Sequence, residues 1–227
     1  MGRLVWLWAF ACLCGCAVSR QATPPTAGGG EAIAAGARVL LIESDIKFYV
    51  ITAGGVAEPQ PDWTETARTN FVSATRRELA AHGHDLVTTN PDAPDERLIS
   101  YEKLHQAVAQ TIAIWNGRLP AKHGRFDYSL GPGVSFMKER YGADYALFVT
   151  YHDARASGGQ QAKAIIAGLF GVYGVNVGGQ SGYASLVDLT SGDVVWCRFV
   201  GVGTGDLREP AGADKTVSVL FEGMHGG

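Results

Sequence analysis

Short apolar runs rich in β-branched residues recur along the chain and predict strands. A continuous apolar run of four to eight residues between turn signals is typical of a buried strand, whereas strict alternation is typical of a half-buried one. Residues 190–193 form a polar turn between two such runs, so the last two strands are expected to form an antiparallel hairpin. The predicted strands cover residues 38–43, 47–52, 85–89, 142–149, 182–188 and 194–201.

Apolar residues spaced three or four apart predict helices between these strands. The first helix is expected to begin at Asp62, whose carboxylate can cap a free backbone N–H, with Glu65 completing a capping box. Its apolar stripe is predicted to comprise Trp63, Ala67, Phe71 and Ala74. The stripe of the second helix is predicted to comprise Tyr101, Leu104, Val108, Ile112 and Trp115. The predicted helices cover residues 62–82, 96–116, 134–141, 163–170 and 212–224.

The order of these elements predicts an α/β (α+β) fold class. Helices are expected to pack on a mixed β-sheet, with a C-terminal β-hairpin and a final helix. Residues 37–227 have the length of a single domain. The formal net charge is −3, and Arg76-Arg77 is an isolated pair on a helix, so a nucleic-acid partner is not expected.

The first sixteen residues are organised like a bacterial lipoprotein signal. Arg3 gives the start a positive charge, and residues 4–11 form an uncharged apolar run, too short for the roughly 20 residues that span a bilayer. Such a segment is typical of a secretory signal. The tetrapeptide LCGC at 13–16 resembles the lipobox, which implies cleavage before Cys16 and a diacylglycerol on its thiol. An ordinary signal peptide with a chance cysteine is the alternative.

The cysteine content agrees with lipidation. Cys12 and Cys14 would leave with residues 1–15, and Cys16 would be alkylated, which leaves Cys197 and excludes an internal disulfide in the mature chain. A single thiol in an oxidising compartment is expected to be buried. Cys197 follows the apolar residues 194–196, which agrees with burial and disfavours a redox or nucleophilic role.

The segment after Cys16 is predicted to be a tether. Residues 16–36 are rich in Ala, Gly, Pro, Ser and Thr, and such a segment cannot bury enough apolar surface to offset the entropy of ordering it. Ala17 stands where lipoproteins of the inner membrane often carry Asp, so the lipobox resemblance implies the cell outer membrane. The expected organisation is a signal at 1–15, a lipidated tether at 16–36 and one folded domain at 37–227.

Four further segments, at 62–64, 130–134, 142–145 and 185–196, carry a family resemblance. Together they resemble a family of proteobacterial outer-membrane lipoproteins. The order of elements is also similar to the α/β domain of the curli-secretion lipoprotein and to the N-terminal domain of the Tol-system propeller protein. The resemblance covers most of residues 38–225. It implies an envelope location and brings no catalytic residues.

Three places could carry chemistry. His82 and His84 flank a helix end and could share a metal, although a closed zinc site needs about four ligands and an open one three. His105 follows Leu104 and lies on the face of Tyr101, Val108 and Ile112, where a lone histidine is usually a hydrogen-bonded residue at the edge of the core. His152 and Asp153 follow the apolar run of a strand, and strand ends host active sites in α/β folds. None of these forms a recognisable constellation, so no catalytic residue, metal or cofactor is expected.

The glycine-rich segment at 162–179 is apolar and carries one charge, Lys163. Residues 171–179 lack the Lys-Ser/Thr and the glycine spacing of nucleotide-binding loops, so nucleotide binding is not expected. The segment is predicted to be a helix packed on the domain followed by a glycine loop. The alternative is an exposed apolar insertion that contacts lipid or a partner.

These observations favour a non-enzymatic lipoprotein that is anchored in the outer membrane and faces the periplasm. The lipid on Cys16 would be its link to the membrane, and other envelope proteins or further copies of the chain would be its partners. The alternative is a hydrolase-like envelope enzyme with a site near His152 and Asp153.

Overall fold

The computed structural model of the protein describes residues 33–42, 45–89, 95–115, 122–123, 125–169, 178–201 and 203–225, without the side chains of 164–169. The predicted signal and the predicted lipidation residue Cys16 lie outside these ranges. Ile33, inside the predicted tether, is buried in the core, so the packed part of the chain extends at least to this residue.

A mixed sheet is built around the long central strand β5 (Tyr145–Ala156). One edge of β5 pairs along its length with antiparallel β6 (Gly178–Asp188), which pairs in turn with antiparallel β7 (Val194–Val200). The other edge of β5 pairs first with β1 (Arg38–Leu41) and then with β2 (Asp45–Ile51), both parallel. The fold class predicted from the sequence is therefore confirmed, including the β6–β7 pair and the helix after it.

Two short strands extend this sheet. β4 (Asp85–Thr88) is the strand predicted at 85–89, and it lies parallel to β1. β3 (Ala57–Pro59) lies antiparallel to β2, in a segment for which the sequence predicts neither a strand nor a helix. Its sequence ends in proline, which has no N–H to donate, and proline in a sheet is confined to edges and strand ends.

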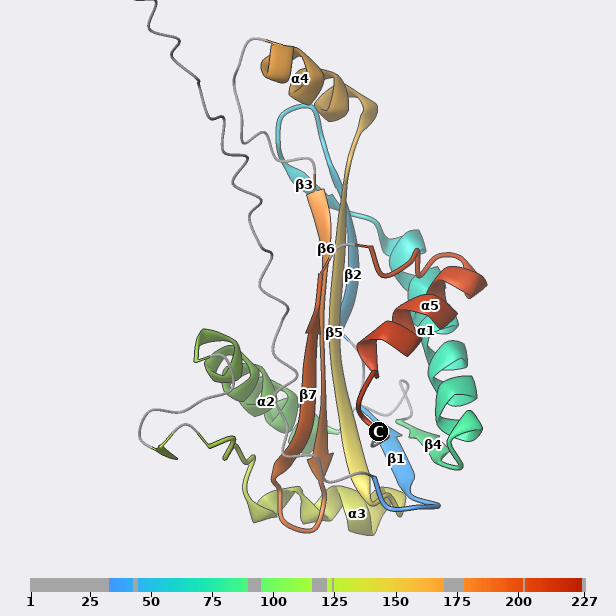
Figure 1. Ribbon diagram of the computed structural model, residues 1–227, viewed down its shortest axis with the longest axis vertical. Helices are drawn as coiled ribbons and strands as arrows, with labels where there is room; N and C mark the ends of the chain where they lie inside the picture. The colour runs from blue at the N-terminus through green and yellow to red at the C-terminus, as the bar shows by residue number, and fades with distance from the viewer. Residues whose placement is uncertain are drawn as a thin grey trace, which may run out of the picture.

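Helices cover both faces of the sheet (Figure 1). α1 (Pro61–Ala81) and α5 (Pro210–Leu220) pack on one face. α2 (Glu96–Ile114) and α3 (Ser135–Tyr141) pack on the other, where α3 follows a short 3-10 turn (Pro132–Val134). Successive side chains of a strand point to opposite faces, so each sheet residue belongs to one of two separate cores.

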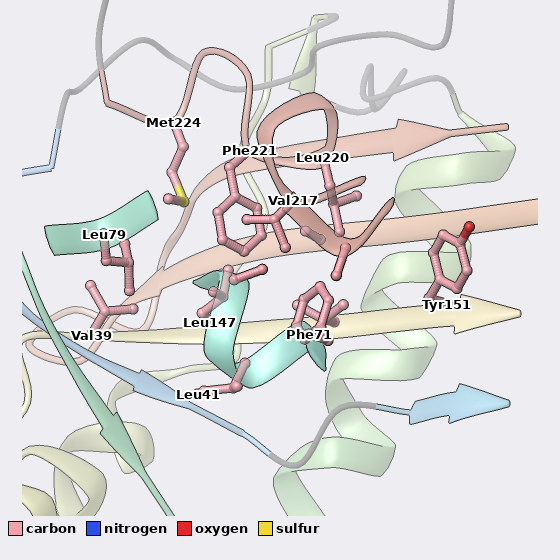
Figure 2. Close-up of a cluster of buried hydrophobic side chains, with 14 of the residues drawn as sticks. Val39, Leu41, Phe71, Leu79, Leu147, Tyr151, Val217, Leu220, Phe221 and Met224 are labelled. Carbon is pink, nitrogen blue, oxygen red and sulfur yellow. The ribbon is translucent and has the colours of Figure 1, made fainter. Parts of the chain in front are cut away.

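The first core joins α1 and α5 to the sheet. Phe71 of α1 is fully buried and meets Phe221 edge-on, with ring centroids 6.3 Å apart. Figure 2 shows both rings among Val217 and Leu220 on one side and the sheet residue Leu147 on the other. Val217 and Leu220, on the helix predicted at 212–224, thus face the sheet.

α1 begins differently from the prediction. The helix starts at Pro61, the N-cap is Gln60, and no side chain caps the helix there. Asp62 is therefore inside the first turn, where its negative charge favours the helix dipole instead of capping an N–H. Proline is well suited to the first helical position, because its fixed φ matches the helix and its missing N–H would have no partner.

The buried face of α2 also differs from the predicted stripe. Ile112 is buried as expected, but Leu104 and Trp115 are exposed, and the other buried residues are Leu98 and His105. The helix is thus turned so that a histidine, and not the neighbouring leucine, faces the sheet. The neighbouring Leu104 lies on the outer surface of the domain.

The predicted helix within 162–179 is present as α4 (Gly158–Leu169). It lies at the tip of the extended β5–β6 pair, away from α2 and α3 (Figure 1). The Lys163 ammonium donates to the carbonyl of Ala53 in the β2–β3 turn. Residues 170–177, which include most of the predicted glycine loop, lie outside the described ranges, so the choice between a packed helix and an apolar insertion stays open. In the described part of the chain, no helix is long and apolar enough to cross a membrane.

Candidate functional site

His152 and Asp153 do not form a common site, because consecutive residues of β5 point to opposite faces of the sheet. The His152 Nε2 lies 3.3 Å from a carboxylate oxygen of Asp45 on the α2 face. Asp153 is almost completely buried on the α1–α5 face. The site proposed for the enzyme alternative is therefore not assembled by the fold.

Asp153 belongs to a network of ion pairs. The guanidinium of Arg155 lies 2.9 Å from Asp153 and 3.1 Å from Asp206, and Arg208 lies 2.7 Å from Asp206. The Gln180 amide donates to both Asp153 and the carbonyl of Gly205. The hydrogen bond to Asp153 raises the pKa of Arg155. The network links residues 205–208, which precede α5, to the sheet, so the carboxylate of Asp153 has a structural role.

His105 is buried between α2 and the sheet. Its Nε2 is 2.5 Å from the hydroxyl oxygen of Ser185, and its ring stacks on Phe148 with centroids 4.1 Å apart. Burial lowers the pKa of His105 to about 3, so the ring is neutral at neutral pH. Ser185 is fully buried, so its hydroxyl is not exposed, although His105 lines the groove beside α2. The pair resembles a nucleophile and base in distance, but its burial indicates a structural hydrogen bond, in agreement with the structural interpretation of His105.

A groove of about 440 Å³ runs along α2 where the helix meets the sheet. Burial acts to raise the pKa of Asp45 in this groove, but the hydrogen bond and charge of Lys47 together with nearby His152 lower it overall. Asp45 is therefore ionised, and its carboxylate contacts both Lys47 and His152. The lining combines that charged end with uncharged side chains, namely Ala109, Gln110, Ala113, Tyr183 and Phe199.

The outer side of α2 exposes large apolar side chains. Five large apolar residues are exposed in the described ranges, and four of them lie on α2 or its C-cap: Ile99, Leu104, Ile114 and Trp115. We call these four residues the α2 surface. Ile114 is 76% exposed, and Leu104 is 43% exposed. The fifth residue, Val56, lies in the distant β2–β3 turn.

The part of the α2 surface from Leu104 onward is poor in charge, whereas Ile99 shares its side of the helix with Glu102 and Lys103. From Leu104 to Trp115 the helix carries no Asp, Glu, Lys or Arg, and His105 is buried and neutral. Solvent-exposed helices are normally rich in charged residues, whereas the centres of protein interfaces are depleted of them. The amphipathic pattern predicted α2 correctly as a helix, but it assigned Leu104 and Trp115 to the core, and so it did not reveal this surface.

His82 and His84 meet a third histidine that the sequence analysis did not connect to them. The ring of His225 stacks on His82 with centroids 3.8 Å apart, and on His84 at 5.5 Å. Glu78 lies one helical turn before His82, and its carboxylate is 3.9 Å from the His82 Nδ1. Burial, with the nearby charges of His82 and His84, lowers the pKa of His225 to about 4. The spacing of Glu78 and His82 on one helix is visible in the sequence, but the arrival of His225 is a consequence of the fold.

Two further predicted residues have different outcomes. Cys197 is fully buried, as predicted, and it lies near Tyr183, whose pKa is raised by burial. Cys16 lies outside the described residues, so its lipidation stays a prediction. Gly171 and Gly174, in the segment for which nucleotide binding is not expected, also lie outside the described residues.

No family model and no curated protein matches the chain. Among solved structures, the PelC dodecamer from Paraburkholderia phytofirmans is 16% identical over 87% of this chain and 94% of that chain, with a TM-score of 0.42. Lipoprotein GNA1162 from Neisseria meningitidis is 14% identical over 73% of this chain and 79% of its own, with a TM-score of 0.31. The LpoB C-terminal domain from Salmonella enterica is 15% identical over 76% and 87%, with a TM-score of 0.30. All three TM-scores are below 0.5, so the function of this chain has to be inferred from its own residues.

Proposed function

We propose that this chain is a non-enzymatic lipoprotein, anchored in the outer membrane through Cys16, that binds envelope proteins or further copies of itself through the α2 surface. The observation that carries the proposal is the concentration of exposed apolar side chains on one helix. An exposed apolar patch on a soluble domain usually marks an interaction site, because leaving it in water is unfavourable. The lipobox-like tetrapeptide at 13–16 supports the location.

The composition of the α2 surface favours a protein partner. Its exposed residues include an aromatic side chain, Trp115, and three branched aliphatic ones, with no charged residue after Lys103 on the helix. Interface centres are enriched in aromatic residues and depleted of Lys, Glu and Asp. Gln106 and Gln110 in the neighbouring groove offer amides that can hydrogen-bond to the edge of such a partner.

The enzyme alternative has less support. Its proposed residues His152 and Asp153 lie on opposite faces of β5, and Asp153 is held by Arg155. In the other pair of catalytic residue types, His105 and Ser185, both residues are buried and the serine hydroxyl is fully enclosed. A binding role fits the described residues better than an acid–base or nucleophilic one.

Charging the α2 surface should abolish association without unfolding the domain. We expect Leu104→Glu combined with Ile114→Glu to remove complexes seen by chemical cross-linking and sedimentation of the detergent-extracted protein. Surface substitutions usually change stability by less than about 0.5 kcal/mol, so the melting temperature should stay nearly constant. Val56→Glu is the matched control, because Val56 is equally apolar and 61% exposed but lies elsewhere. Complexes that survive the double substitution, or that Val56→Glu also removes, would argue against the α2 surface.

The anchor has its own test. Cys16→Ser removes the thiol that would form the thioether, so the chain should remain as an uncleaved precursor or appear as a soluble periplasmic form. Cys12→Ser is the control, because Cys12 precedes the lipobox and its loss should leave processing intact. Membrane fractionation together with intact mass spectrometry gives the readout. If the Cys16→Ser protein keeps the mass and fractionation of the unsubstituted protein, the lipid anchor is excluded.

A further inference from the structure

Glu78, His82 and His225 converge at the C-terminal end of α1. One ligand atom from each, a carboxylate oxygen and two imidazole nitrogens, lies within 4.8 Å of the other two. Glu78 and His82 share one face of the helix, because residues four apart lie one above the other. His225 comes from the turn after α5, more than 140 positions later in the chain.

Buried anchors hold His225 in this place. Phe221 packs edge-on against Phe71 of α1, and Met224 is almost completely buried in the same core. The backbone N–H of Met224 donates to the carbonyl of Phe221, which closes the turn. Since both residues are fixed in the core that α1 and α5 share, the next residue, His225, is held beside His82 at the end of α1.

The hydrogen bonds of the cluster leave ligand atoms available. The His82 Nδ1 lies 3.9 Å from the Glu78 carboxylate, but it donates to the backbone carbonyl of Glu78 at 2.9 Å, so it carries the proton in this arrangement. Metal binding would therefore use Nε2, which keeps its lone pair, or Nδ1 after it releases this hydrogen bond. A ring N–H that donates to a backbone carbonyl is the arrangement that orients metal-binding histidines. Both ring nitrogens of His225 are enclosed without a hydrogen-bond partner in the described structure. An enclosed nitrogen without a partner is unfavourable, and a bound cation would remove that penalty for the nitrogen that carries the lone pair.

We propose that Glu78, His82 and His225 bind a divalent late transition-metal ion of the Zn²⁺ class. Two imidazole nitrogens and a carboxylate oxygen form a ligand set typical of zinc, whereas Mg²⁺ and Ca²⁺ prefer oxygen ligands alone. Three protein ligands leave one coordination position for water or for a group from a partner. The bound ion would fasten the C-terminal turn to the end of α1.

Metal binding would require the side chains of the cluster to move. Zinc binds imidazole nitrogen at about 2.0–2.1 Å, so ligand atoms within 4.8 Å of one another must move inward by roughly 1 Å. His82 and His225 stack with an interplanar angle of 1°, and the lone pairs of parallel rings do not meet at one point. One ring must therefore tilt out of the stack. Glu78 and His82 are partly exposed, so their side chains are free to make this movement.

Calorimetric titration of the full chain, purified in detergent without a polyhistidine tag, tests the site. Zn²⁺ should bind at one ion per chain at neutral pH, while Mg²⁺ should not bind. His225→Ala and Glu78→Gln should each weaken Zn²⁺ binding by at least about tenfold. His152→Ala is the matched control and should bind Zn²⁺ like the unsubstituted chain, because His152 lies next to Asp45 on the opposite face of the sheet.

A second readout keeps the test decisive if a variant is unstable. Co²⁺ bound to nitrogen and oxygen ligands in a tetrahedral site gives visible absorption, which should appear with the unsubstituted chain and disappear when Zn²⁺ is added. Absence of saturable Zn²⁺ binding and of the Co²⁺ spectrum would overturn the proposal. So would equal weakening by His152→Ala and His225→Ala, which would indicate nonspecific binding to surface histidines.

Discussion

Replacing Phe71 with alanine should destabilise the domain by about 3–5 kcal/mol, the usual cost of deleting a buried phenylalanine. Phe71 is fully buried and joins α1 to α5 through its contact with Phe221. The free energy of unfolding from urea denaturation gives the readout. Val56→Ala is the control, because Val56 is largely exposed and its change should cost less than about 0.5 kcal/mol.

The double variant Phe71→Ala/Phe221→Ala extends this test to the contact itself. Aromatic pairs contribute about 0.5–1.5 kcal/mol beyond the area that they bury, so the double variant should cost less than the sum of the two single ones. A loss of less than about 1 kcal/mol for Phe71→Ala would mean that α1 does not pack on the sheet through this side chain.

Acid should destabilise the domain through His105. Burial lowers the pKa of His105 to about 3 in the folded state, while the unfolded chain keeps an ordinary value near 6.5. Between these two values the unfolded chain binds a proton that the folded chain does not, so stability falls as the pH falls below 6.5. Each pH unit in this window costs about 1.4 kcal/mol, or about 2–3 kcal/mol between pH 6.5 and 4.5.

His105→Gln isolates this contribution. Glutamine can still hydrogen-bond to Ser185 but does not titrate, so the variant should lose about 2–3 kcal/mol less between pH 6.5 and 4.5 than the unsubstituted domain. Burial lowers the pKa of His84 and His225 as well, and both act in the same direction, but they are present in both proteins and cancel in the comparison. Identical slopes of stability against pH would show that His105 is not buried as a neutral ring.

The strands and helices could be predicted where the local pattern decides the structure. The strand from Arg38 and β7 carry their signal in adjacent residues, and both were predicted within two residues of the observed bounds. β6 was predicted from 182 to 188 but begins at Gly178. β3 was missed because its three residues end in Pro59 and are held by pairing with β2. Such pairing depends on a neighbouring strand and not on the pattern of the segment itself.

The functional surfaces could not be predicted in the same way. α2 is apolar on more than one side, so periodicity alone could not decide whether Leu104 or His105 faces the sheet. The choice depends on Ser185, which is 80 positions away and offers His105 a hydrogen bond inside the core. The proposed metal ligands likewise needed the packing of Phe221 on α1 before His225 could be placed beside His82.

Site-specific photo-cross-linking in intact envelopes tests the central claim most directly. A photoreactive phenylalanine analogue at Leu104 should form covalent adducts with a protein partner, whereas the same analogue at Val56 should form few. An adduct at twice the 24.0 kDa of the chain, less the signal, would identify a second copy, and any other mass would identify a different protein. Adducts are expected with the analogue at Leu104 or Ile114, and few with the analogue at Val56. An absence of adducts from α2, or equally many adducts from Val56, would contradict binding through the α2 surface.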